Sequence, residues 1–171
     1  MTYNEFADLL LKSVVAKSYG SNRIDVVFDV YHDHSIKNAE RGNRSTGELQ
    51  FSVIIGSAKI KQWGTFLSNN KNKAAFIRFL VSRWKDHPSE LGQSNLFLGF
   101  DTECICVRSN GHWERVEALE SNHEEADTRM LLHAQHICQT FEKVVIYTPD
   151  TDVSLIAIGA SQQMNGSFFI L

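Results

Sequence analysis

The chain has 171 residues, of which 43% are hydrophobic and 22% charged, and its formal net charge is −3 at pH 7. A chain of this length and composition can bury one core, and the length favours a single domain. The negative charge excludes a surface that is basic throughout, so any contact with nucleic acid must come from a local patch.

Cysteine usage and hydropathy limit the cellular setting. The sequence has three cysteines, an odd number, and two of them form a single Cys-x-Cys at Cys104 and Cys106. This pattern indicates a reducing environment rather than a disulfide scaffold. No segment is typical of a signal peptide or of a transmembrane helix, which needs about 20 apolar residues. We therefore expect an intracellular protein of the nucleus or cytoplasm, without membrane contact.

The first elements in the chain are a predicted helix and a predicted strand. Residues 1–18 have helical periodicity, with an apolar face made of Phe6, Leu9, Leu10, Val14 and Val15. Residues 24–29 are typical of a strand and end in Asp29. Lys37, Arg41 and Arg44 follow at helical spacing and predict a basic stripe just past that carboxylate. A solvated surface helix explains the same stripe equally well.

The middle of the chain contributes architecture. Residues 51–55 are either a short strand or part of a connection, and helices are predicted from Trp63 and from Asn70, the second ending before Pro88. The second helix has an apolar face made of Ala74, Ile77, Leu80, Val81 and Trp84. Residues 96–100, 104–107 and 113–116 are strand candidates, with a turn at 109–111. The aromatic side chains of residues 63–84 are interpreted as core, and base stacking is the alternative.

An amphipathic helix is predicted from about residue 124 to residue 141. Its apolar face contains Met130, Leu131, Ala134, Ile137, Cys138 and Phe141. Ser121 and Asn122 are candidate N-caps, each with a Glu three residues later, as in a capping box. Glu125 and Asp127 lie near the start of this helix, where acids favour the helix dipole without any metal.

A second acidic pair follows a predicted strand. Residues 144–147 form a continuous apolar run, typical of a strand buried on both faces, and Pro149 ends it. Asp150 and Asp152 would then leave the carboxyl end of the strand, where open α/β folds bind ligands. If the segment stays extended, both carboxylates point to one side and could bind a hard divalent cation. Asp-Thr-Asp is also common at helix caps and turns.

The order of these motifs carries a family resemblance. Val-Phe-Asp at 27–29, Glu-Ala-Asp at 125–127 and Asp-Thr-Asp at 150–152 resemble the PIN-like nuclease domain of flap endonuclease, XPG and Asteroid-like proteins. The sequence of residues 123–130 and 149–153 is also similar to that of uncharacterised, often transposon-associated animal proteins that carry such a domain. The resemblance covers roughly 23–44 and 122–159. It implies an α/β fold of three layers, with a mainly parallel central sheet flanked by helices, to which residues 96–116 would add a β-hairpin.

The resemblance also implies a chemistry. In that family, carboxylates bind two divalent ions, Mg²⁺ or Mn²⁺, which activate water and stabilise the leaving oxygen during phosphodiester hydrolysis. Nucleic acid is the implied substrate, and we favour DNA over RNA. Glu124 has no counterpart in the family and is assigned to the helix cap. Carried over to this sequence, the implied catalytic and metal-binding residues are Asp29, Glu125, Asp127, Asp150 and Asp152. The implied phosphate contacts are Lys37 and either Arg41 or Arg44.

The chain also departs from the family pattern. The family begins with an Asp on a first strand, but residues 1–18 predict a helix, and the sequence ends inside an apolar run at 167–171. We therefore expect one PIN-like domain over residues 1–171, lacking the first strand and incomplete at the C-terminus, and such a domain could be inactive.

Two alternatives remain open at the level of sequence, and a third is weighed and disfavoured. The first is a non-catalytic module that binds nucleic acid or protein on a degenerate PIN-like fold. The second is another magnesium-dependent enzyme, either Toprim-like or an Asp-x-Asp glycosyltransferase; Toprim domains take their Glu from the end of a strand. A zinc site made of His133 and His136 with Cys104 or Cys106 is disfavoured, because closed zinc sites usually show two tightly spaced ligand pairs.

Overall fold

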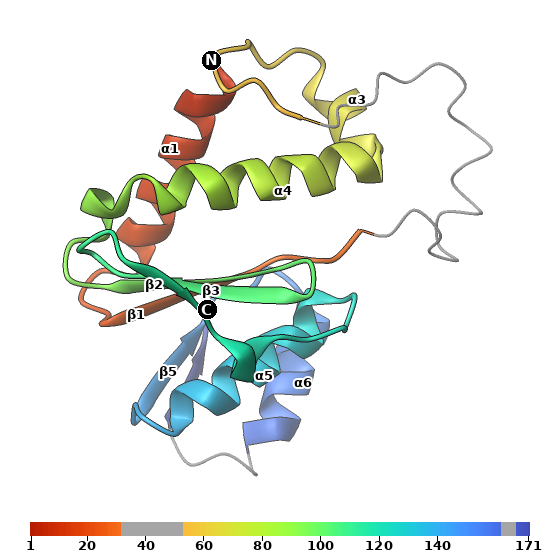
Figure 1. Cartoon of the computed structure of the whole chain (residues 1–171). Helices are drawn as coiled ribbons and strands as arrows, with labels where there is room; N and C mark the ends of the chain where they lie inside the picture. Colours follow the sequence, from red (N-terminus) through yellow and green to blue (C-terminus); the bar gives the residue numbers. More distant parts are fainter. Residues whose placement is uncertain (32–52, 162–166) are drawn as a thin grey trace.

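The computed structural model describes residues 1–31, 53–161 and 167–171 (Figure 1). The helices are α1 (Tyr3–Lys17), α3 (Trp63–Ser68), α4 (Asn70–Lys85), α5 (Ala126–Cys138) and α6 (Thr151–Ser161), with short 3-10 helices η2 (Pro88–Leu91) and η3 (Glu117–Leu119). The strands are β1 (Arg23–Val27), β2 (Asn95–Phe100), β3 (Glu103–Val107), β4 (Trp113–Arg115), β5 (Lys143–Ile146) and β6 (Ser167–Ile170).

The described strands form two sheets. The larger has the order β1-β2-β3-β4, in which β1 and β2 are parallel and the other two pairings are antiparallel. The smaller is a parallel pair of β5 and β6. The predicted α/β class and the added antiparallel strands are confirmed. A mainly parallel central sheet is not confirmed in the described part of the chain, because β2 and β3 are joined by a two-residue turn, which can connect only antiparallel neighbours.

The first hydrophobic core lies between one face of the larger sheet and the helices α1 and α4, which cover that face in Figure 1. The alternation of each strand sends Ile24, Leu96 and Leu98 into this core, together with Ile105 and Val107 of β3. Burial of each such side chain stabilises the fold by about 1.5–3 kcal/mol.

Helix α1 confirms the helix predicted for residues 1–18. It begins with a capping box between Thr2 and Glu5. The buried stripe is Tyr3, Ala7 and Leu11, whereas Leu9, predicted on the apolar face, is 53% exposed. The other predicted members of the apolar face, Phe6, Leu10, Val14 and Val15, are partly buried against this core, so only Leu9 was misplaced.

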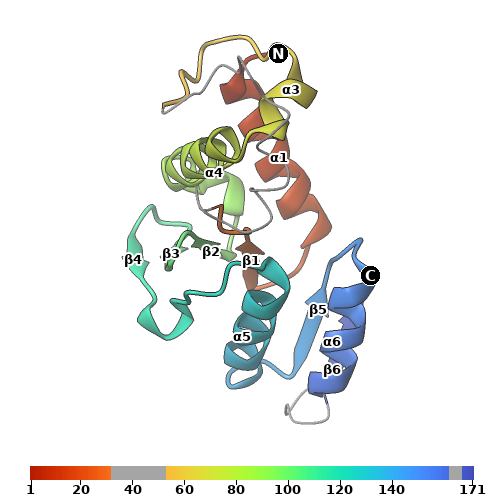
Figure 2. The same cartoon turned by 90° about the vertical axis from the view of Figure 1, so that its right-hand side faces the viewer.

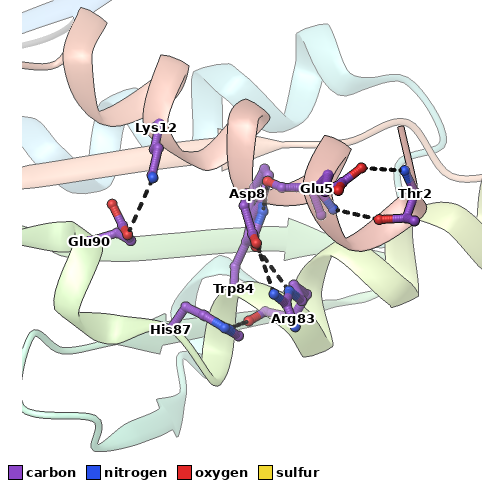
Figure 3. Close-up of polar contacts among 9 residues, drawn as sticks. Thr2, Glu5, Asp8, Lys12, Arg83, Trp84, His87 and Glu90 are labelled. Carbon is purple, nitrogen blue, oxygen red and sulfur yellow. Dashed lines mark hydrogen bonds and ion pairs between the residues drawn. The ribbon is translucent and has the colours of Figure 1, made fainter. Parts of the chain in front are cut away.

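Polar contacts fix α1 against α4 beside this core (Figure 3). The Arg83 guanidinium donates two hydrogen bonds to the Asp8 carboxylate, at 2.9 and 2.8 Å. The indole N–H of Trp84 donates to the carbonyl of Ala7 at 2.9 Å. Trp84 is 2% exposed, so its one polar group is satisfied where water cannot reach it. These contacts set the register of the two helices.

The aromatic residues of α3 and α4 belong to the same core. Helix α4 is capped by Asn69, whose side chain accepts from the backbone N–H groups of Lys71 and Asn72. Phe66 and Phe76 are buried, and the Trp63 ring stacks on Phe66 at a centroid distance of 5.2 Å. The prediction that this aromatic group is core is confirmed.

A second, smaller core joins α5, α6 and the β5–β6 pair. Its buried members are Ala134, Val144, Ile146, Val153 and Ala157. The prediction that residues 144–147 are buried on both faces is wrong, since β5 alternates and Val145 is 50% exposed. Among the described helices, α5 and α6 cover one face of the two-stranded sheet, and Val145 and Phe169 are exposed on the other. Helices α5 and α6 run side by side in the same direction in both views (Figures 1 and 2).

Three of the predicted site residues lie outside the described residues: Lys37, Arg41 and Arg44. Within the ranges that the structure describes, no helix has the length and apolar character required to cross a membrane.

Candidate functional site

Asp29 lies where β1 meets the start of α5. It follows the end of β1 by two residues, and its Oδ1 accepts a hydrogen bond from the backbone N–H of Ala126 at 2.8 Å. The next residue, Val30, donates its N–H to the carbonyl of Glu124 at 2.9 Å. An acid from one end of the chain is therefore held at the N-terminus of a helix near the other end, where the helix dipole favours negative charge.

This contact corrects the predicted helix cap. Helix α5 begins at Ala126, and its N-cap is Glu125, whose side chain makes no capping hydrogen bond. Neither Ser121 nor Asn122 caps the helix; the Ser121 hydroxyl accepts from His123 N–H at 3.2 Å instead. Asp29 takes the place of a local cap, which no pattern of neighbouring residues could have revealed.

The acids of α5 lie in the same neighbourhood as Asp29. Asp127 is in the first turn, where its carboxylate accepts from the N–H of Thr128 at 2.7 Å. The hydroxyl of Tyr31 donates to Asp29 Oδ2 at 3.4 Å. Burial raises the pKa of Tyr31 to about 12, and the negative charges of Asp29 and Glu125 add to that rise. One tyrosine thus experiences both carboxylates.

The second acidic pair lies at the start of α6. The prediction of an extended segment with both carboxylates on one side is wrong, because the helix begins at Thr151. The Asp150 carboxylate accepts from the N–H of Asp152 at 2.9 Å, which is the bond of a helix N-cap. The helix forms because an Asp just before it accepts a hydrogen bond from an N–H group that would otherwise have no partner. Asp150 is therefore the N-cap of α6, and Asp152 lies in its first turn.

The structure brings the two acidic helix starts to one end of the fold. Helices α5 and α6 pack together and point the same way, so Glu125 and Asp127 share an end with Asp150 and Asp152 (Figure 2). Asp29 is held at that end by α5. Over residues 1–31, 53–161 and 167–171, however, no three His, Cys, Asp or Glu side chains are grouped closely enough to hold a metal ion.

Sequence reasoning missed a set of charged and polar side chains between α5 and β1, here called the polar seam: Arg23, Asp25, Arg129, His133 and His136. Arg23 donates two hydrogen bonds to Asp25, both at 2.7 Å, and its third nitrogen lies 2.9 Å from His136 Nδ1. His133 Nδ1 lies 2.6 Å from Asp25 Oδ2. The helix spacing of 129, 133 and 136 is the one sequence signal that could have identified this seam.

Burial shapes the electrostatics of the polar seam. Burial alone would raise the pKa of Asp25, but the hydrogen bonds from His133 and Arg23 outweigh it, and the pKa is lowered. The pKa of His136 is lowered, mainly by burial and then by the charge of Arg23. Both groups therefore favour the deprotonated form in the folded protein.

The zinc alternative receives no support from this geometry. His133 and His136 interact with Asp25 and Arg23, and the described side chains contain no metal-holding group. Cys104 lies close enough to feel the charge of Asp25, but burial raises the pKa of its thiol to about 12. A protonated thiol is a poor metal ligand.

Two open pockets flank the start of α5. One, of about 360 Å³, is lined by Val30, Tyr31, Arg78, Asp101, Thr102 and Glu103 and adjoins Asp29 through Tyr31. The other, of about 650 Å³, lies over the outer face of α5 and is lined by residues that include Thr128, Leu131 and Gln135.

No protein-family model, no curated protein and no solved structure matches the chain. Its function is therefore argued from its residues and their geometry.

Proposed function

We propose that this chain is a divalent-metal-dependent nuclease domain of the PIN-like type, which hydrolyses phosphodiester bonds of nucleic acid. The observation that carries the proposal is the contact between Asp29 and Ala126, at 2.8 Å. It joins the acid that follows β1 to the acidic start of α5, although the two are 97 positions apart in the sequence.

The donor chemistry fits Mg²⁺ or Mn²⁺. The acids at this end offer only carboxylate oxygens, the ligands that hard divalent cations prefer. Like-charged carboxylates repel one another, so a cation between them is what would draw these exposed side chains together. Two bound metal ions would supply an activated water and neutralise negative charge on the phosphate. The residues proposed to hold the ions are Asp29, Glu125, Asp127, Asp150 and Asp152.

The substrate is proposed from charge. A net charge of −3 repels a polyanion, so cations must be concentrated near the acids. We assign that role to Lys37, Arg41 and Arg44, with DNA as the favoured substrate. Two described cations already lie near Tyr31: Arg78 lines the same pocket, and Lys73 Nζ is 4.9 Å from the tyrosine ring centroid.

The Toprim-like alternative is less well supported. Glu125 comes after η3 and directly before α5, rather than at the end of a strand. A binding module on a degenerate PIN-like fold remains the second candidate, and it differs from the nuclease in chemistry rather than in architecture.

A metal titration tests the proposal. We expect MnCl₂ to raise the melting temperature of the parent chain, because an ion that binds only the folded state stabilises it by about 2.7 kcal/mol at 100 times its dissociation constant. Asp29→Asn and the double change Asp150→Asn with Asp152→Asn should each remove most of that shift. Asp86→Asn, an exposed acid at the C-cap of α4, is the matched control and should keep it.

An unchanged melting temperature of the parent chain on addition of MnCl₂ would contradict the proposal. If the shift is present, incubation with flap, hairpin and single-stranded DNA separates the two candidates. The nuclease predicts cleavage that the Asp29→Asn variant loses, whereas the binding module predicts retention of the substrate without cleavage.

A further inference from the structure

Arg129 is buried under the acidic end of the fold without a carboxylate partner. Its residue surface is 0% exposed, and among the described residues no carboxylate lies within ion-pair distance of it. Its Nε has no hydrogen-bond partner within the described part of the chain. A buried guanidinium without a counter-ion is costly, and a well-packed apolar side chain would often stabilise the same site as well or better. Stability alone therefore does not explain the residue.

The contacts of Arg129 are with backbone carbonyls just after β1 and at the start of β3. Its Nη1 donates to the carbonyl of Phe28 at 3.1 Å, and its Nη2 donates to the carbonyl of Glu103 at 3.3 Å. The first carbonyl belongs to the peptide bond that leads into Asp29. The second belongs to the first residue of β3, immediately after the turn at Asp101.

The backbone of Asp29 is thereby held from three directions. The N–H of Phe28 donates to the carbonyl of Gly99 on β2, its carbonyl accepts from Arg129 on α5, and the N–H of Val30 donates to Glu124. Of these three partners, only Arg129 is a side chain. A planar fork with two separate donors can bridge two carbonyls, which a single ammonium group cannot do from the same place.

We propose that Arg129 is a positioning residue that fixes the Asp29 carboxylate at the start of α5 and so prepares the acidic site for a divalent cation. The inference rests on the proposed function for its last step only. The guanidinium does not touch the ion or the substrate. It ties the peptide segment from which the carboxylate projects to the start of β3. Its charge also offsets the negative charge of Asp101 and Asp29.

Two substitutions of Arg129 test the proposal against a merely structural role. Arg129→Met replaces the charge with an apolar chain of similar length, and Arg129→Lys keeps the charge but loses the fork. The control is Leu96→Ala, which opens a cavity in the core on the opposite face of the sheet and touches neither Asp29 nor α5.

The first readout needs no metal. The amide resonance of Ala126 should shift between the parent and Asp29→Asn, because the acceptor of its hydrogen bond changes. Both Arg129 variants should show the same shift, and hydrogen exchange of the Ala126 N–H should become about 10-fold faster in them. Leu96→Ala should leave the resonance at its position in the parent. An Ala126 amide that is unchanged in both Arg129 variants would overturn the proposal.

The second readout is the affinity for MnCl₂ by calorimetry, below the unfolding range of every variant. We expect Arg129→Met to weaken Mn²⁺ binding about 10-fold. Its free energy of unfolding should be no lower than that of Leu96→Ala, whose Mn²⁺ affinity should stay within about 2-fold of the parent. If the parent itself binds no Mn²⁺, the proposed function fails, and the amide readout still decides the role of Arg129.

An observation on the unaltered chain covers the case in which the variants do not fold. The Arg129 Nη protons should give slowly exchanging resonances with nuclear Overhauser contacts to Phe28 and Asp29. Rapidly exchanging Nη protons without those contacts would overturn the proposal.

Discussion

The two faces of the larger sheet are held by different forces. On the face toward α1 and α4, aliphatic and aromatic side chains fill the space, and Trp84 is the largest of them. On the face toward α5, the polar seam takes their place, with Asp25 bonded to both Arg23 and His133. Apolar packing tolerates small shifts, but a hydrogen-bonded charge network holds in one arrangement only. The comparison suggests that the polar seam sets the position of α5, and with it the meeting of Asp29 and Ala126.

The largest expected effect comes from breaking the polar seam. Asp25→Ala leaves Arg23 buried without its counter-charge, and removing one partner of a buried pair costs about 3–5 kcal/mol. Urea unfolding measures this loss. Glu114→Ala removes a partner of Arg108 in an exposed pair and should cost less than about 1 kcal/mol. Equal losses in the two variants would mean that the seam is no stronger than a surface contact.

An apolar truncation on the opposite face should cost roughly 3 kcal/mol. Leu98→Ala removes a fully buried side chain from the core under α1 and α4, within the range for cavity-forming changes. Leu155→Ala on α6, where the side chain is largely exposed, is the control and should stay near the parent. We expect Leu98→Ala to keep the Ala126 amide resonance and Asp25→Ala to change it. The reverse result would assign the position of α5 to the apolar face.

Acid should weaken the seam in two stages. The folded pKa values of His136 and Asp25 both lie below their ordinary values of 6.5 and 3.8. A lowered pKa contributes stability that is complete above the ordinary value and is lost as the pH falls through the folded value. Unfolding free energy measured from pH 7 to pH 3 should therefore fall below pH 6.5 and fall further below pH 3.8. Asp25→Ala should show a smaller second stage, to which Asp8 still contributes because its hydrogen bonds from Arg83 also lower its pKa. Stability that rises on acidification would contradict this assignment.

The smallest expected effect comes from Gly99, which lets α5 approach the sheet. A Cβ added at Gly99 would lie 3.0 Å from His133 Nε2 and 3.5 Å from Arg129 Nη2. Gly99→Ala should therefore cost about 1–2 kcal/mol by overpacking. Gly64→Ala in α3, where an added Cβ meets nothing within 4 Å, should instead gain up to about 1 kcal/mol. A Gly99→Ala variant as stable as the parent would show that the approach is not tight.

The same contrast explains what the sequence could predict. Periodicity located α1, α4, α5 and the strands of the larger sheet, because burial on one face leaves a repeating pattern. The apolar run at 144–147 gave a wrong prediction of burial for Val145, because whether both faces of a strand are covered depends on which distant elements pack against them. Periodicity also failed at the start of α5, where the cap is an acid 97 positions away in sequence.

The candidate site divides in the same way. The acids Asp29, Glu125 and Asp127 could be expected near one another from their places beside predicted elements, and Tyr31 joins them through a hydrogen bond. The conformation at Asp150 was not predictable by alternation, because a helix cap and an extended pair have the same sequence. The role of Arg129 was hidden, since a lone arginine in a helix is ordinarily solvated.

If three separate segments supply carboxylates to one divalent-cation site, bound Mn²⁺ must broaden the NMR signals of all three segments. At a small fraction of one equivalent of MnCl₂, we expect the amide signals of Asp29, Ala126 and Asp152 to broaden together and to recover together on addition of a chelator. Broadening at only one of the two helix starts, or none at any of the three, would contradict it.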